Sequence, residues 1–145
     1  MAFMVRNLTA GIPLAFMLSG CGVPTIKVDP AKFSTLALCD RVDVIQRTSG
    51  LVFEAPRDYI NEIYDEIESR NEFTKTEMRL IRERSISVGM SENALKCSWG
   101  NPTRKNSYSS SLGLGRTQYV YDHSFTDYYV YVEDGVVTSW SKHER

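Results

Sequence analysis

Histidine is scarce in this chain, with only His123 and His143 among 145 residues. The sequence also lacks Gly-x-Ser-x-Gly, a Walker loop and His-Glu-x-x-His, patterns that position a nucleophile, a phosphate or a catalytic zinc ion. A nucleophilic Cys97 with His123 as its base is conceivable. Cys97 lies in a predicted short helix beside Trp99, however, where packing or a disulfide explains it better. We therefore expect no enzyme, no cofactor, no metal and no small-molecule substrate.

A basic excess and a long apolar run are absent as well. The 17 basic and 18 acidic side chains give a formal net charge of −1, whereas a nucleic-acid partner requires a concentrated basic surface. No stretch approaches the roughly 20 apolar residues that a membrane-spanning helix needs. The hydrophobic share of 42% is that of a globular protein, and the length suits one domain with a tail.

The N-terminus departs from this average. Arg6 is the only charged side chain before Lys27, and residues 8–18 are apolar except for Thr9, Gly11 and Pro13. A short positive region followed by such a run is typical of a signal peptide. The alternative is a buried first helix, in which Gly11 and Pro13 would fit poorly. We predict that residues 1–20 form a cleaved signal peptide.

The end of this segment indicates the type of signal. Leu18-Ser19-Gly20-Cys21 resembles a bacterial lipobox, in which the peptide is cut between Gly20 and Cys21 and the Cys21 thiol becomes lipidated. The alternative is an ordinary secretory signal followed by a chance cysteine. Gly22 after the cysteine favours, by resemblance, the outer membrane. We expect a lipid-anchored, periplasm-facing protein in which residues 21–32 form the tether.

Two further cysteines, Cys39 and Cys97, lie 58 residues apart. The bacterial envelope permits disulfides, so the two could be paired. They could equally be two separate buried thiols, because free cysteine is common in cores. Two cysteines without neighbouring histidines do not provide the four ligands of a structural zinc site. The sequence leaves both readings open.

The first half of the mature chain reads as an N-terminal extension over residues 33–73. Uneven alternation of apolar residues predicts short extended segments over residues 33–55. A helix over residues 56–70 follows from the helical spacing of its apolar side chains. Those side chains are Tyr59, Ile60, Ile63, Tyr64 and Ile67.

Two short helices and a sheet are predicted after this extension. Thr74 and Glu77 form a capping box at the start of a helix over residues 73–84. Ser91 begins the next helix, which ends at Gly100. Asp134-Gly135 predicts a hairpin, and the fold class is α+β, with two short helices packed on a three-stranded antiparallel sheet and an additional N-terminal helix with extended segments. The strand segments are expected at residues 103–108, 116–122 and 128–141.

Several of these residues carry a resemblance to a known family. The stretch "ISVGMSENALKCSWGNP" and the later strand "YYVYVEDGVVTSW" resemble the SmpA/OmlA family of small outer-membrane lipoproteins, which includes the BamE-type subunits of the β-barrel assembly machine. The matching positions belong mostly to turns and helix ends, so they indicate a fold more than a function. They are Gly89, Met90, Ser91, Trp99, Gly100, Pro102 and Gly135. The resemblance implies a family-like domain over residues 74–145 and an interaction or scaffold role in outer-membrane protein assembly or envelope integrity.

Tyrosines are concentrated in the predicted sheet. Because tyrosine is favoured at interfaces, we expect Tyr119, Tyr129 and Tyr131 to contact an envelope protein partner. Ordinary β-propensity is the alternative explanation of these rings. A second functional class is an inhibitor or ligand-binding lipoprotein that uses its sheet face.

Overall fold

The computed structural model of this protein describes residues 28–48, 57–109, 115–123 and 125–144. The predicted α+β class is confirmed: in these ranges the chain forms a short 3₁₀ helix, four α-helices and one antiparallel sheet. The elements are η1 (Pro30–Lys32), α1 (Thr35–Thr48), α2 (Arg57–Ser69), α3 (Lys75–Arg82), α4 (Glu92–Trp99), β1 (Arg104–Ser109), β2 (Gly115–His123), β3 (Thr126–Glu133) and β4 (Val136–Glu144).

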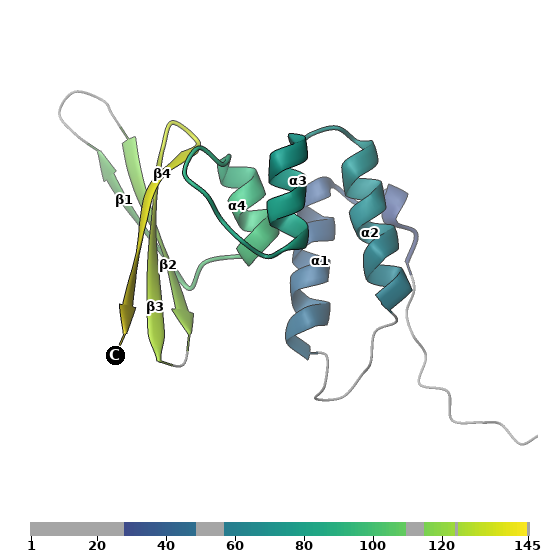
Figure 1. The fold of residues 1–145 in the computed structure, drawn as a ribbon, viewed down its shortest axis with the longest axis horizontal. Coiled ribbons are helices and arrows are strands. Elements are labelled where there is room, and N and C mark those ends of the chain that lie inside the picture. Colours follow the sequence, from purple (N-terminus) through teal and green to yellow (C-terminus); the bar gives the residue numbers. More distant parts are fainter. Residues whose placement is uncertain (1–27, 49–56, 110–114, 124, 145) are drawn as a thin grey trace, which may run out of the picture.

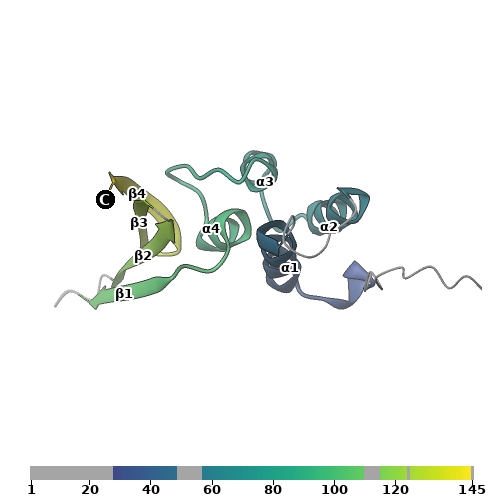
Figure 2. The same ribbon diagram turned by 90° about the horizontal axis from the view of Figure 1, so that it is seen from below.

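The elements are arranged in layers. Figures 1 and 2 show α4 against one face of the sheet, α1 and α3 behind α4, and α2 with η1 at the far end. Helix α4 contacts α1, α3 and β4. The helical layers therefore cover one sheet face, which we call the inner face, whereas no helix of the described residues covers the opposite, outer face.

The sheet has four strands, in the order β1-β2-β3-β4, rather than the three predicted. The reason is the turn at Asp134 and Gly135, which adopt φ values of 49° and 77°. This turn divides the predicted segment 128–141 into the two paired strands β3 and β4. The hairpin itself is confirmed, because both positions adopt the positive φ that such a turn requires.

The extended segments predicted over residues 33–55 are wrong where the structure describes them. Residues 35–48 form the helix α1, and residues 49–55 lie outside the described ranges. Leu38, Cys39 and Val42 are buried in α1 at helical spacing. The β-branched residues of this segment favour strands only weakly, and packing against the other helices overrides that preference.

The remaining helices agree with the sequence. Helix α2 buries Tyr59, Ile63, Tyr64 and Ile67, as the spacing predicts. The capping box of α3 is present, with Thr74 accepting from the Glu77 amide. The short helix α4 follows its predicted cap Ser91 and ends before Gly100, which has a φ of 77°.

One continuous core joins the helices to the inner face of the sheet. Ala94 and Leu95 of α4 are fully buried between Ile81 of α3 and the sheet valines Val130 and Val137. The core also includes buried residues of α1 and α2. Helices α1 and α2 of the predicted extension therefore belong to the same core as α3, α4 and the sheet.

Glu77 connects two helix ends. Its Oε2 accepts from the backbone amide of Thr74 at 2.9 Å, and its Oε1 accepts from the backbone amide of Ser91 at 2.9 Å. Partial burial raises the pKa of Glu77, but the hydrogen bonds from Ser91 and Thr74 outweigh burial and hold this pKa below its usual value of 4.5. The ionised carboxylate thus caps α3 and also fixes the residue that caps α4.

We predict that Glu77→Gln lowers the free energy of unfolding by about 1–2 kcal/mol at neutral pH. Because the folded pKa is depressed, the stabilisation is fully present above pH 4.5 and is lost as the pH falls through the folded pKa. Urea unfolding of both proteins between neutral and acidic pH measures this, and the difference should shrink on acidification. Glu83→Gln, at the exposed pair with Arg79, is the control and should change stability by less than about 0.5 kcal/mol. A difference that stays constant across the pH range would contradict the role of the ionised carboxylate.

Candidate functional site

The predicted cleavage and lipidation site, Gly20 and Cys21, lies outside the described residues, as does the signal peptide. Within the described ranges, no helix is long and apolar enough to cross a membrane. The lipid anchor therefore stays a prediction from the sequence. The described residues do contain the other two cysteines and the three predicted binding tyrosines.

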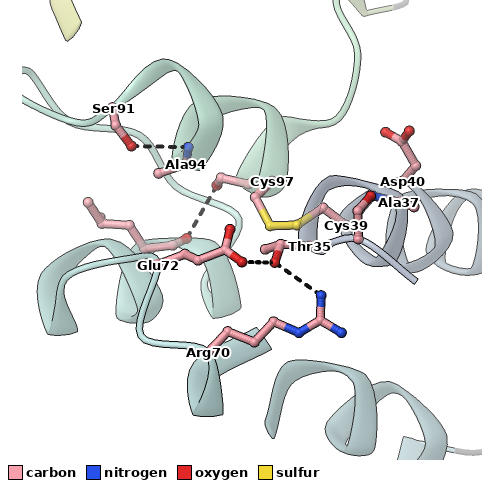
Figure 3. Close-up of a disulfide and its surroundings, with 12 residues drawn as sticks. Thr35, Ala37, Cys39, Asp40, Arg70, Glu72, Ser91, Ala94 and Cys97 are labelled. Carbon is pink, nitrogen blue, oxygen red and sulfur yellow. Dashed lines mark hydrogen bonds between the residues drawn. A yellow bond between two sulfur atoms is a disulfide. The ribbon is translucent and has the colours of Figure 1, made fainter. Parts of the chain in front are cut away.

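Cys39 and Cys97 form a disulfide. Cys39 belongs to α1 and Cys97 to α4, and the two side chains are 2% and 4% exposed. Figure 3 shows the bond crossing between the two helices. Of the two alternatives that the sequence left open, the structure shows the disulfide, and both cysteines are buried.

A polar network lies next to the disulfide and joins α1 to the end of α2 (Figure 3). Thr35 donates its hydroxyl to Glu72 Oε1 at 2.6 Å and accepts from Arg70 Nη1 at 3.2 Å. Arg70 also pairs with Glu66 at 2.9 Å and donates to the Pro30 carbonyl at 3.3 Å. These half-buried contacts satisfy one another, so we assign them a structural role.

Tyr119 does not belong to a binding surface, and its prediction as a partner contact is wrong. It lies opposite Val130 in the sheet, on the inner face, and is 1% exposed. Its hydroxyl donates to Glu92, and burial together with this carboxylate raises the pKa of Tyr119. The ring therefore lies between the sheet and α4. The sequence did not predict this, because a one-residue change of strand register exchanges the two faces of a strand.

Tyr129 and Tyr131 lie on the outer face. They alternate along β3 with the buried residues Val130 and Val132, and both are half-buried by neighbouring strands. Tyr108 of β1 is 56% exposed. It lies opposite Arg116, which pairs with Glu133 on the same outer face. We call Tyr108, Tyr129 and Tyr131 the outer tyrosine patch.

Neighbouring side chains hold part of this patch in place. The Arg116 guanidinium lies 4.4 Å from the Tyr131 ring centroid, and Gln118 donates to the Tyr131 hydroxyl at 2.9 Å. Gln118 in turn accepts from Asn106 of β1 at 2.9 Å. An ordered surface of aromatic rings and amides loses little side-chain entropy when a partner binds.

The inner face carries a second surface feature that the sequence did not predict. A cleft of about 450 Å³ opens between α1, α4 and the end of the sheet at which β2 ends and β3 begins. Its lining combines aromatic rings with two guanidinium groups that come from distant parts of the chain. The lining residues are Arg47, Arg84, Trp99, His123, Thr126 and Tyr128.

Asp43 organises the cationic wall of this cleft. The buried Asp43 carboxylate pairs with Arg84 Nη2 at 2.7 Å through Oδ1 and with Arg47 Nε at 2.7 Å through Oδ2. Arg84 also donates to Gln46 Oε1 at 2.6 Å. One carboxylate thus balances only one of the two arginines, and the wall keeps a positive charge.

In comparisons with models of protein families, with curated proteins and with solved structures, no match to this chain was found. The resemblance to the SmpA/OmlA family stays a prediction that rests on the residues quoted above. The surfaces of the described residues are therefore the basis on which a function can be proposed.

Proposed function

We propose that this protein is a lipid-anchored envelope protein that acts as an interaction or scaffold module at the bacterial outer membrane. In this proposal, Cys21 carries the lipid and the outer tyrosine patch holds a protein partner in outer-membrane protein assembly or envelope integrity. The observation that carries the proposal is the outer face itself: a twisted antiparallel sheet with aromatic residues on the side that no described helix covers.

The composition of the outer tyrosine patch suits a protein partner. Tyrosine and arginine are enriched at the centres of protein interfaces, and here Tyr131 and Arg116 already lie against each other. Tyr108 adds an exposed ring on the edge strand β1. These rings can exclude water over a surface whose rim is polar.

The position of the tether supports the same proposal. The chain enters the fold at η1, which lies at the end remote from the sheet (Figure 1). Between Cys21 and Val28 the extended chain spans at most roughly 24 Å. An anchor at Cys21 would hold the α2 end near the membrane and direct the sheet into the periplasm. Confining two partners to one membrane raises their effective concentration, so a small patch suffices.

One experiment tests both parts of the proposal. Tyr129 is replaced by a photoreactive benzoylphenylalanine in intact cells, in the otherwise native chain and in a Cys21→Ala background. The native background should give a membrane-bound protein with a discrete cross-linked partner. Cys21→Ala should move the protein to the soluble fraction and reduce the cross-link about tenfold or more, because the effective concentration falls.

The control carries the same photoreactive residue at Val88, which is 59% exposed and belongs to the loop between α3 and α4 rather than to the outer tyrosine patch. Equal cross-linking from Val88 and Tyr129 would show that the patch has no special role. Unchanged membrane fractionation of Cys21→Ala would overturn the lipid anchor. Recovery of one soluble enzyme from Tyr129 would favour an inhibitor instead of a scaffold.

A further inference from the structure

The cleft on the inner face is separate from the outer tyrosine patch and is not used by the proposed function. We propose that this cleft binds an acidic segment of a partner protein, in which a carboxylate lies next to an apolar or aromatic side chain. The carboxylate contacts Arg47 and Arg84, and the apolar group packs on Trp99 and Tyr128.

Charge defines the anionic part of this ligand. Arg47 uses Nε for its pair with Asp43, so that pair does not require its two terminal nitrogens, and the side chain is 58% exposed. Arg84 is 34% exposed beside it. At the far side, Lys142 lies opposite Tyr128 but pairs with Glu144 at 2.6 Å. The excess is thus about one positive charge, which one carboxylate matches, whereas a nucleic acid or a phosphate dianion carries more.

The arginines are held in position before a ligand binds. Arg84 adopts a φ of 51°, a conformation that is unusual for a residue with a side chain. Trp99 stabilises it by donating its indole N–H to the Arg84 carbonyl at 2.9 Å, and Asp43 and Gln46 fix the guanidinium. Such positioning lowers the entropy cost of binding an anion. It also connects the cationic wall directly to the aromatic floor.

The aromatic floor defines the apolar part of the ligand. Trp99 packs edge-on against Tyr121 and Tyr128, with ring centroids 5.3 and 5.1 Å apart. His123 and Trp140 flank Tyr128 at 5.6 and 6.5 Å. Rings packed edge-to-face in this way provide a rigid surface for an aliphatic or aromatic side chain.

Exposed aromatic residues extend this surface beyond the cleft. Trp140 is 46% exposed, and Phe125, next to the lining residue Thr126, is 78% exposed. Exposed apolar groups that adjoin a cleft mark an interaction site more often than isolated ones do. A peptide segment can place a carboxylate at the arginines and further side chains along these exposed rings, which favours it over a small metabolite.

The chain provides its own reporter for a binding experiment. Its only two tryptophans are Trp99 and Trp140, one in the cleft lining and the other next to Tyr128. The probe is a blocked pentapeptide with one carboxylate, Gly-Gly-Glu-Phe-Gly, added to the full-length protein in detergent. We expect a saturable change of tryptophan emission. Replacing the glutamate of the probe by glutamine, or its phenylalanine by alanine, should weaken binding about fivefold or more.

Arg47→Gln should weaken binding of the probe about fivefold to tenfold. Arg79→Gln is a matched control, because Arg79 is also about 59% exposed and pairs with Glu83 four residues away on another surface. Its affinity should equal that of the native protein. Both variants remove an exposed charge, so circular dichroism should show a native fold for each.

Three outcomes would overturn the proposal. The first is the absence of a saturable emission change at about 5 mM probe. The second is an equal affinity of the native and Arg47→Gln proteins, or of the charged and glutamine-substituted probes. The third is an emission change with phosphatidylglycerol vesicles but none with the peptide, which would assign the cleft to a lipid surface. None of these results bears on Cys21 or the outer tyrosine patch, so this proposal fails or holds independently of the proposed function.

Discussion

Removing the Cys39–Cys97 disulfide should lower the free energy of unfolding by about 4 kcal/mol. The bond closes a loop of 58 residues, which in the chain-entropy account restricts the unfolded chain strongly. The loop contains α2 and α3 and most of α1 and α4. Because the free energy of unfolding of a domain of this size is about 5–15 kcal/mol in total, the loss would bring the protein close to unfolding at physiological temperature.

Urea unfolding of the native protein, with and without reductant, measures this difference. The double variant Cys39→Ala and Cys97→Ala should match the reduced protein within about 1–2 kcal/mol, because each alanine also leaves a small cavity. Reductant should not alter the double variant further, which is the control for effects on other groups. A loss below about 1 kcal/mol on reduction would contradict the expectation.

This result also bears on where the protein folds. A disulfide of such weight suits a compartment outside the reducing cytosol, which is the compartment that the proposed signal peptide and Cys21 anchor require. A chain retained in the cytosol would lack the bond and a large part of its stability. The buried pair is thus compatible with the proposed location outside the cytosol.

Features that depend on neighbouring residues could be predicted from the sequence. The capping box at Thr74 and Glu77, the cap at Ser91 and the hairpin at Asp134-Gly135 each depend on a few residues and are all present. Helix α2 was equally predictable, because its apolar residues recur every three to four positions, which fits a helix and not a strand. In these elements the local backbone preferences agree with the final fold, so a few neighbouring residues suffice to predict them.

Features that depend on distant contacts could not be predicted. Helix α1 is rich in β-branched residues, and its helical form follows from packing on α2 and α4. The orientation of Tyr119 depends on strand register, which only the folded sheet defines. The cleft on the inner face unites Arg47, Arg84 and Tyr128 from three separate parts of the chain, and no spacing in the sequence indicates that they meet.

Gly100→Ala should lower the free energy of unfolding by about 3–4 kcal/mol. Gly100 has a φ of 77° and a ψ of −165°, a conformation that is essentially restricted to glycine and in which a side chain adds roughly 1–3 kcal/mol of strain. In addition, a Cβ at this position would lie 2.6 Å from Asp43 Oδ2 and 2.7 Å from Asp43 Cγ. The carboxylate cannot give way easily, because it is buried and paired with Arg84 and Arg47. Moving it would leave a buried charge poorly paired, which is costly.

A second glycine with positive φ, Gly89, separates the cost of backbone strain from the cost of the clash with Asp43. Gly89→Ala meets the same kind of strain at a φ of 89°, but its Cβ would have no atom within 4 Å, so it should cost only about 1–2 kcal/mol. Urea unfolding of both variants measures the difference. In an Asp43→Ala background, the clash at Gly100 disappears, and the cost of Gly100→Ala should fall to that of the backbone strain alone, about 1–3 kcal/mol. Equal costs of the two glycine variants in the native background would show that Asp43 moves freely. In that case the carboxylate could not be the fixed centre that positions Arg84 and Arg47 at the cleft.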